Sequence, residues 1–251
     1  MTSIMPFQIE RHESLDSTNR AARDAARQNR PDRLVIVADR QTAGRGRLGR
    51  EWESPSGRNL YFSILLHAGF SREWPSELAI VTACSLARSL SKISKQIFKL
   101  RWPNDIYCNE RKVAGILLEW VDRADTQASV VVGVGINVNS RPEDFSPALQ
   151  QTATSLKAET GRPFDRTAVL TDLLSAMDTD LAEYGRLRIQ PFLKRWMIAT
   201  DLKGQRIHVE QGSESWDGTF VGLDPHGALQ ATLADGTLRT VVAADVTKVS
   251  R

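Results

Sequence analysis

A glycine- and arginine-rich segment, residues 41–50 (QTAGRGRLGR), has the composition of an anion-binding loop. Three glycines and three arginines occupy six of the seven positions of residues 44–50. Glycine lets backbone N–H groups approach an anion closely, and arginine adds planar charged groups that match phosphate and carboxylate oxygens. The loop alone also fits a flexible surface segment or a nonspecific RNA-binding segment. The neighbouring Trp52, Ser54-Pro55 and Gly57 favour an ordered loop.

A second group of chemically useful residues is Trp102-Pro103-Asn104-Asp105, which ends a short predicted strand. The carboxylate of Asp105 is a ligand type that suits Mg²⁺, and the amide of Asn104 suits a phosphate or a ribose. Lys112 opens the next predicted strand, where a rigid backbone would hold its charge beside a reacting carboxylate. The alternative is an ordinary Pro-Asn-Asp turn followed by a solvated lysine.

The segment Gly133-Val134-Gly135-Ile136-Asn137-Val138-Asn139 resembles part of a dinucleotide-binding fingerprint. The next glycine of that fingerprint and the helix that should follow are both missing, which argues against a Rossmann fold. Glycines inside a strand allow a ligand or another backbone to approach closely, and Asn137 would lie near that approach. Simple strand packing is the alternative.

Ser17-Thr18-Asn19 begins a predicted helix. Serine and threonine are ordinary residues at helix N-termini, where they cap free N–H groups. The functional interpretation is a set of neutral donors and acceptors for a polar, uncharged ring.

Hydrophobic periodicity predicts the elements that must position these residues. Strands are expected at residues 7–11, 34–38, 60–66, 98–102, 106–108, 113–121 and 130–138, with a turn at 109–112. Helices are expected at residues 17–29, 75–93 and 169–181, and residues 140–163 read as loop-rich. Beyond residue 201, alternating segments at 206–210, 216–223, 228–233 and 238–242 predict a small antiparallel β-barrel. We therefore expect a domain at residues 1–200 and a smaller one at 201–251.

The composition is that of an ordinary globular protein of 251 residues, with 41% hydrophobic and 25% charged residues. The net charge of +3 is too small to indicate nucleic-acid binding by itself. Cys84 and Cys108 belong to no C-x-x-C pair, and we expect two reduced thiols in a cytoplasmic protein. We see neither a signal-peptide pattern nor an apolar run near the ~20 residues that cross a bilayer.

In combination, these motifs resemble the biotin–protein ligase family, and the resemblance extends over nearly the whole chain. It is carried by STN, by GRGRLGR with Trp52 and Ser54-Pro55, by WPND, RKVAGILLE and GVGINVN, and by the barrel-like tail. Arg101 stands where the family commonly has lysine, which preserves the charge. The resemblance implies an α+β catalytic domain with a mixed β-sheet and helices, plus a small C-terminal antiparallel β-barrel.

The resemblance also implies a two-step reaction. The carboxylate of biotin attacks the α-phosphate of MgATP, which gives biotinyl-5'-AMP and pyrophosphate. A lysine of the biotin carboxyl carrier domain of a carboxylase then takes the biotinyl group and releases AMP. Bringing two anions together requires positive charge, and the reactive adenylate requires a loop that excludes water.

The family's residue roles carry over onto matching positions of this chain. The residues implied in biotin binding are Ser17, Thr18, Asn19, Gln41, Gly44, Arg45, Gly46, Arg47, Lys112 and Gly115. The residues implied in ATP and adenylate binding are Arg50, Trp52, Asn104, Asp105 and Asn137, and Trp52 would cover the adenylate by stacking. The catalytic groups would be Arg47, Lys112 and Asp105, with Asp105 also holding Mg²⁺.

Four other expectations accompany this interpretation. A lipoate or octanoate ligase of related fold is the nearest alternative, but such acyl chains lack the ureido ring that Ser17–Asn19 and Gln41 suit. A nonenzymatic RNA-binding protein is the alternative from another class, and it predicts steep salt dependence. Only 16 residues precede Ser17, so we expect no helix-turn-helix module and no operator binding. A homodimer is compatible with the sequence.

Overall fold

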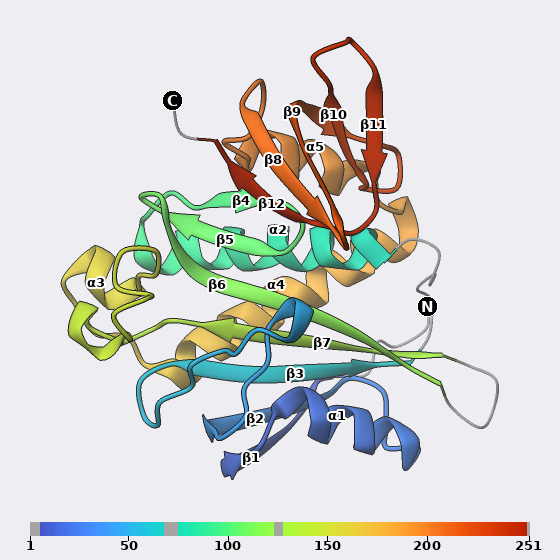
Figure 1. Cartoon of the computed structure of the whole chain (residues 1–251). Coiled ribbons are helices and arrows are strands. Elements are labelled where there is room, and N and C mark those ends of the chain that lie inside the picture. Colours follow the sequence, from blue (N-terminus) through green and yellow to red (C-terminus); the bar gives the residue numbers. More distant parts are fainter. Residues whose placement is uncertain (1–5, 68–74, 123–127, 250–251) are drawn as a thin grey trace. The chain divides into compact units, whose positions relative to one another are not determined.

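The computed structural model describes residues 6–67, 75–122 and 128–249, so the outermost residues of both predicted domains lie outside it. The chain divides into two compact units. Unit 1 combines Met1–Phe70 with Cys108–Leu174, and unit 2 combines Ser71–Tyr107 with Ser175–Arg251. Each unit therefore draws on segments that are distant in sequence (Figure 1). The predicted boundary near residue 200 stays a prediction.

Unit 1 is built on a mixed sheet whose strands are ordered β1-β2-β3-β7-β6. β1 runs parallel to β2, and the other neighbouring pairs are antiparallel. The bounds are β1 (Gln8–Leu15), β2 (Leu34–Gln41), β3 (Leu60–Leu66), β6 (Arg111–Val121) and β7 (Ser129–Ile136). All of β3 and the first five residues of β2 are buried, and both stretches are mostly apolar, as expected for inner strands of a covered sheet.

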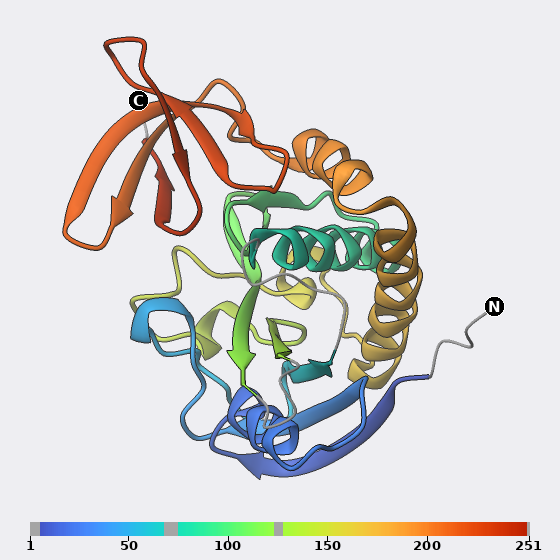
Figure 2. The same ribbon diagram turned by 90° about the vertical axis from the view of Figure 1, so that its right-hand side faces the viewer.

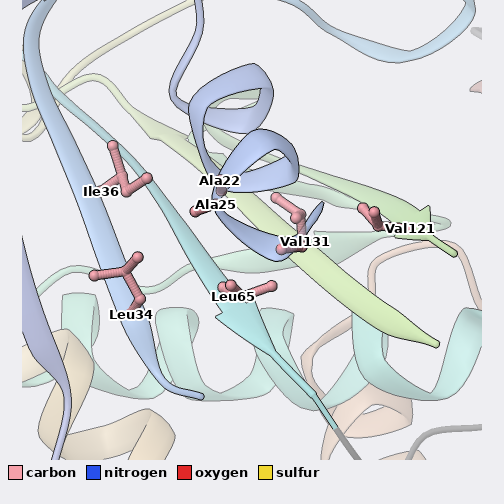
Figure 3. Packing of buried hydrophobic residues seen from close by; sticks show 8 residues of the cluster. Ala22, Ala25, Leu34, Ile36, Leu65, Val121 and Val131 are labelled. Atoms are coloured by element: carbon pink, nitrogen blue, oxygen red, sulfur yellow. The ribbon is translucent and has the colours of Figure 1, made fainter. Parts of the chain in front are cut away.

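Helix α1 (Thr18–Arg27) covers one face of this sheet with its alanines. Directly paired residues of antiparallel strands point to the same face, so Leu65 of β3 and Val131 of β7 share it. Figure 3 shows Ala22 and Ala25 facing these side chains, with Leu34, Ile36 and Val121 in the same cluster. Small residues let the helix lie close to the sheet, which brings its first turn within hydrogen-bonding reach of the strands.

The remaining part of unit 1 contains short helices where the sequence predicted loops. They are the 3-10 turns η1 (Arg47–Gly49) and η2 (Pro142–Asp144) and the helix α3 (Leu156–Thr160). Ser155 caps α3, since its hydroxyl accepts a hydrogen bond from the Ala158 N–H at 3.0 Å. Gly161 ends α3 with a left-handed conformation (φ 74°) that glycine adopts without strain.

Unit 2 contains α2 (Pro75–Ser94), β4 (Lys99–Arg101), β5 (Asp105–Cys108) and α5 (Gln190–Ala199). α4 (Arg166–Leu187) begins in unit 1 and ends in unit 2. α2 and the long helix α4 confirm the predicted helices, while α5 was not predicted. α2 packs against α5 and β4, and the fully buried Phe192 and Trp196 of α5 supply much of the apolar surface.

Unit 2 also holds a five-stranded antiparallel sheet ordered β11-β10-β9-β8-β12, whose strands are strongly bent (Figure 2). It consists of β8 (Arg206–Gln211), β9 (Glu214–Leu223), β10 (Leu229–Thr232), β11 (Leu238–Val241) and β12 (Asp245–Lys248). The first four strands confirm the predicted segments. β12 was not predicted, because its sequence DVTK is short and mostly polar.

Both cysteines are free and buried, which confirms the prediction of two reduced thiols. Burial raises the pKa of Cys84 to about 12 and that of Cys108 to about 11. Within the described residues, no helix is long and apolar enough to cross a membrane.

Candidate functional site

The glycine–arginine loop folds back on itself as a short hairpin. The Trp52 N–H donates to the Gly44 carbonyl at 3.0 Å, and the Gly46 N–H donates to the Arg50 carbonyl at 2.7 Å. η1 forms the tip, where Leu48 has a positive φ of 53° and is 73% exposed. The loop is therefore ordered, as Trp52 and the residues beside it predicted, and its tip projects an apolar side chain into solvent.

Gly44 cannot be replaced without moving the loop backbone. A Cβ atom at this position would lie 2.4 Å from the Trp52 carbonyl oxygen and 2.7 Å from the Ser54 hydroxyl. Real Cβ atoms essentially never approach another atom this closely. The glycine is required where the two arms of the hairpin come together.

The start of α1 is bound to the loop through Gln41, the last residue of β2. Its Oε1 accepts hydrogen bonds from the Thr18 N–H at 2.8 Å and from the Thr18 hydroxyl at 3.2 Å. Its Nε2 donates to the Ser54 hydroxyl at 3.0 Å. Ser17 is buried but its side chain makes no capping hydrogen bond, so the simple helix-cap interpretation of Ser17 is wrong. Gln41 provides the cap instead.

Asn19 is held on the covered face of the sheet by two residues that the sequence analysis missed. The Ser63 hydroxyl donates to Asn19 Oδ1 at 2.6 Å and lies 2.8 Å from Thr18 Oγ1. Asn19 Nδ2 donates to the Glu119 carboxylate at 2.7 Å and to the Leu117 carbonyl at 3.3 Å. The available signals were a serine inside the apolar strand LYFSILL and an acid at the end of RKVAGILLE.

Glycines of β6 and β7 make room for these side chains. A Cβ atom on Gly133 would lie 1.9 Å from Asn19 Oδ1. Gly115 and Gly135 face each other in register, and the Trp52 indole covers both. A Cβ atom would lie 2.4 Å from the indole at Gly135 and 3.0 Å at Gly115. The atoms closest to these glycines therefore belong to side chains of the other motifs, as in the packing alternative, and close approach of a ligand stays a prediction.

Lys112 lies beside the same glycines. Its backbone is fixed by hydrogen bonds from its N–H to the Thr152 carbonyl at 2.8 Å and to its carbonyl from the Thr154 N–H at 2.9 Å. Its Nζ lies 5.4 Å from the centroid of the Trp52 ring and 3.3 Å from the Cβ position of Gly115. Lys112 belongs to β6 and not to the preceding turn, which consists of Asn109 and Glu110, both with positive φ. The predicted four-residue turn is corrected to two residues.

Two buried donors, Trp52 Nε1 beside Gly135 and Arg45 Nε in the glycine–arginine loop, have no acceptor within the described part of the chain. A buried donor without a partner costs free energy, so each is a candidate to bind a ligand atom. Asn137 is also buried, just after the end of β7 at Ile136, which shortens the predicted strand by two residues. Its N–H donates to the Val113 carbonyl at 2.8 Å.

The C-terminal end of the loop is held by Asp39. Its carboxylate accepts hydrogen bonds from the Ser56 hydroxyl and, at 3.0 Å, from the Gly57 N–H, and it pairs with Arg166 at 2.6 Å. The Ser56 hydrogen bond and the Arg166 pair lower the pKa of Asp39, so it is ionised near neutral pH. Both arms of the hairpin are thus tied to β2.

Asn104 and Asp105 belong to unit 2, whereas every other candidate residue belongs to unit 1. Asn104 ends the turn between β4 and β5, as predicted, and Asp105 is the first residue of β5. The turn is anchored by Trp102, whose buried indole donates to the Gly227 carbonyl at 3.0 Å.

Beside this turn, Arg101 pairs with Asp201 at 2.7 Å. Burial opposes ionisation of Asp201, but the hydrogen bond from Arg101 and the charges of Arg101 and Lys248 hold its pKa below the usual value.

Within the residues that the structure describes, no three His, Cys, Asp or Glu side chains gather as a metal site. Mg²⁺ in nucleotide enzymes usually keeps several waters and binds one or two carboxylates together with substrate phosphates. A single carboxylate such as Asp105 fits that donor set.

Residues 12–137 match the Biotin/lipoate A/B protein ligase family, and residues 203–249 match the Biotin protein ligase C terminal domain. The chain is 30% identical over 245 residues to the bifunctional ligase/repressor BirA of Bacillus subtilis (strain 168), covering 98% of this chain and 75% of that protein. It is 32% identical to the biotin--[acetyl-CoA-carboxylase] ligase of Paracoccus denitrificans, and the match covers 77% of this chain and 82% of that protein.

The fold is similar to that of the biotin protein ligase from Aquifex aeolicus in complex with biotin and ATP. The TM-score is 0.85 at 31% sequence identity, with 96% of this chain and 99% of that chain covered. A second similar structure is the biotin protein ligase from Leishmania major in complex with biotinyl-5-AMP. The TM-score is 0.68 at 22% sequence identity, with 95% of this chain and 100% of that chain covered. The likeness extends through both the mixed sheet and the C-terminal antiparallel sheet.

Proposed function

The chain belongs to the biotin/lipoate A/B protein ligase family, and from this we infer that it is an ATP-dependent biotin–protein ligase. In the first step, a carboxylate oxygen of biotin attacks the α-phosphorus of ATP and pyrophosphate leaves, which gives biotinyl-5'-AMP. In the second, the amine of a carrier-domain lysine attacks the biotinyl carbonyl, loses its proton and expels AMP. The acceptor is the biotin carboxyl carrier domain of a biotin-dependent carboxylase.

The observation that carries this proposal is the glycine bed, which we define as Gly115, Gly133 and Gly135. It lets the side chains of two other motifs, Asn19 and the Trp52 indole, lie directly on β6 and β7 beside the ammonium of Lys112. Neutral polar groups, an aromatic ring and a positive charge gathered at one place suit a bicyclic ring with a polar ureido group and a carboxylate.

We assign the biotin pocket to the residues around this bed. Thr18, Asn19 and Gln41 form one hydrogen-bonded group with Ser63, which fixes the directions of their donors and acceptors before the ligand binds. This preorganised neutral group would receive the ureido ring. The full proposed set is Ser17, Thr18, Asn19, Gln41, Gly44, Arg45, Gly46, Arg47, Lys112 and Gly115.

We assign the nucleotide to Arg50, Trp52, Asn104, Asp105 and Asn137. Trp52 offers an aromatic face for stacking, and Arg50 is exposed at the end of the loop tip. Asp105 would hold Mg²⁺ together with ATP phosphate oxygens, and the ion would supply neutralisation of phosphate charge.

Arg47 and Lys112 would stabilise the negative charge that develops as the two anions come together. Because the hairpin is ordered by backbone hydrogen bonds at its base, only its tip needs to move to shield the adenylate from water.

Four features of this proposal stay predictions. They are a cytoplasmic location, the absence of operator-DNA binding, the possible homodimer and the Mg²⁺ site. Size-exclusion chromatography with light scattering tests the dimer, and a gel-shift titration at several salt concentrations tests DNA and RNA binding.

The decisive experiment is mass spectrometry of a carrier domain incubated with the protein, biotin and MgATP. We expect one biotinyl group on one lysine, and no transfer when ATP is omitted. Pyrophosphate exchange measured separately with biotin and with lipoate distinguishes the alternative, because exchange with lipoate alone would refute the assignment. ATP-independent RNA binding without transfer would support the nonenzymatic alternative.

A further inference from the structure

Glu119 connects the two segments to which we assigned biotin binding. It lies on β6 four residues after Gly115, so both point to the sheet face that α1 covers. Its carboxylate accepts hydrogen bonds from Asn19 at 2.7 Å, from Arg45 Nη2 at 2.9 and 3.1 Å, and from Arg23 at 3.1 Å. Two of these donors come from α1 and one from the glycine–arginine loop.

The carboxylate determines the orientation of the Asn19 amide. An ionised carboxylate only accepts hydrogen bonds, so the NH₂ group of Asn19 must face it. Asn19 Oδ1 is then directed toward the Ser63 hydroxyl, over the Cβ position of Gly133. With an uncharged amide at position 119, which can donate as well as accept, this orientation would no longer be fixed.

The same carboxylate holds the base of the loop against β6. Arg45 Nη2 contacts both of its oxygens, while the loop tip at Leu48 stays exposed. Without the carboxylate, Arg23 and Arg45 would be two like charges that have lost the anion they share. Glu119 is only partly exposed, with 19% of its side chain accessible, so its pairs are less screened than surface ion pairs.

We propose that Glu119 is a positioning residue for biotin: it orients Asn19 and fixes Arg45, and so couples the start of α1 to the glycine–arginine loop. This inference rests on the proposed function and deepens it. It assigns the role to a residue outside the proposed biotin-binding set, which acts through two residues inside that set.

The test compares Glu119→Ala and Glu119→Gln with the wild-type protein. Glu119→Gln retains an acceptor but removes the charge, and its similar size favours a folded variant. The matched control is Glu10→Gln, which changes a half-exposed glutamate of β1 that pairs with Arg30. Circular dichroism and thermal unfolding check that all variants are folded, and calorimetry measures biotin affinity.

We expect the Kd for biotin to rise about ten- to hundredfold in Glu119→Ala, as for loss of hydrogen bonds to a charged group. Glu119→Gln should show a smaller rise, and Glu10→Gln none. The KM for biotin should rise while the KM for ATP stays unchanged. A merely structural role would instead reduce the active fraction, which lowers kcat and leaves both KM values unchanged.

Wild-type biotin affinity in both Glu119 variants overturns the inference, as does a loss of kcat with unchanged KM values. If the wild-type protein forms no biotinyl-adenylate at all, the proposed function fails together with the inference. The two failures are therefore distinguishable.

Discussion

Gly133→Ala is the most direct test of the site, because the new methyl group would overlap the side chain of Asn19. Its Cβ would lie 1.9 Å from Oδ1, 2.6 Å from Cγ and 2.8 Å from Nδ2 of Asn19. Asn19 is pinned by Ser63, Glu119 and the Leu117 carbonyl, so it cannot move without breaking hydrogen bonds. The substitution must therefore distort the start of α1.

The expected destabilisation is about 2–4 kcal/mol. Overpacking of a well-filled interior costs about 1–3 kcal/mol, and lost hydrogen bonds to neutral and charged groups cost about 1–3 kcal/mol more. The smaller conformational entropy of alanine in the unfolded chain offsets about 0.4–1 kcal/mol of this loss in the free energy of unfolding. Gly135→Ala should cost less, because the Trp52 indole that it meets is a side chain that can rotate.

Urea unfolding followed by tryptophan fluorescence measures the free energy of unfolding, and calorimetry measures biotin binding. The control is Gly185→Ala in α4, where a Cβ atom meets nothing within 4 Å. It should stabilise the protein by about 0.5–1 kcal/mol. If Gly133→Ala proves as stable as the control and binds biotin like the wild-type protein, the placement of Asn19 on the glycine bed is refuted.

Three other substitutions test individual roles. Lys112→Ala should slow adenylate formation about a hundred- to thousandfold in a pyrophosphate-exchange assay, while the circular dichroism spectrum stays unchanged. Near-normal exchange would show that Lys112 does not belong to the site. Arg47→Ala should weaken biotin binding or speed adenylate hydrolysis, and unchanged values of both refute the closing loop. The pKa of Asp201 is lowered in the folded protein. Its ionised carboxylate therefore stabilises the fold at pH values above about 3.9, its pKa in the unfolded chain, and this stabilisation is lost as the pH falls through the pKa of the folded state. Asp201→Asn should therefore be less stable than the wild-type protein at pH 7, with the difference shrinking below about pH 4; a constant difference contradicts the ion pair with Arg101.

Much of the fold was predictable because local patterns and tertiary packing agree. The apolar run at the start of β2 and the small residues of α1 meet in one buried cluster. α5 was missed although Pro191 in its first turn is a typical helix-start signal, because the sequence offers no clear break between α4 and α5.

The site was only partly predictable, because its supporting residues are recognisable only through partners that are distant in sequence. Ser63 lies 44 positions and Glu119 lies 100 positions from Asn19. A serine in an apolar strand and a glutamate in a mostly apolar strand are signals that something polar must face them, since buried polar groups are hydrogen-bonded. The sequence does not say which residue that partner is, since the strand order and register decide it.

Of the two interpretations of the strand glycines, the structure shows packing, and close approach of a ligand stays a prediction. Each glycine of the bed makes room for a side chain: Asn19 at Gly133, and the Trp52 indole at Gly115 and Gly135. Both side chains come from other motifs to which we assigned binding. A larger residue at any of these glycines would thus disturb packing and ligand contacts together, so stability and biotin affinity should fall in the same variants. Motifs that lie far apart in sequence therefore pack together at these three glycines, because no Cβ atom stands in the way there.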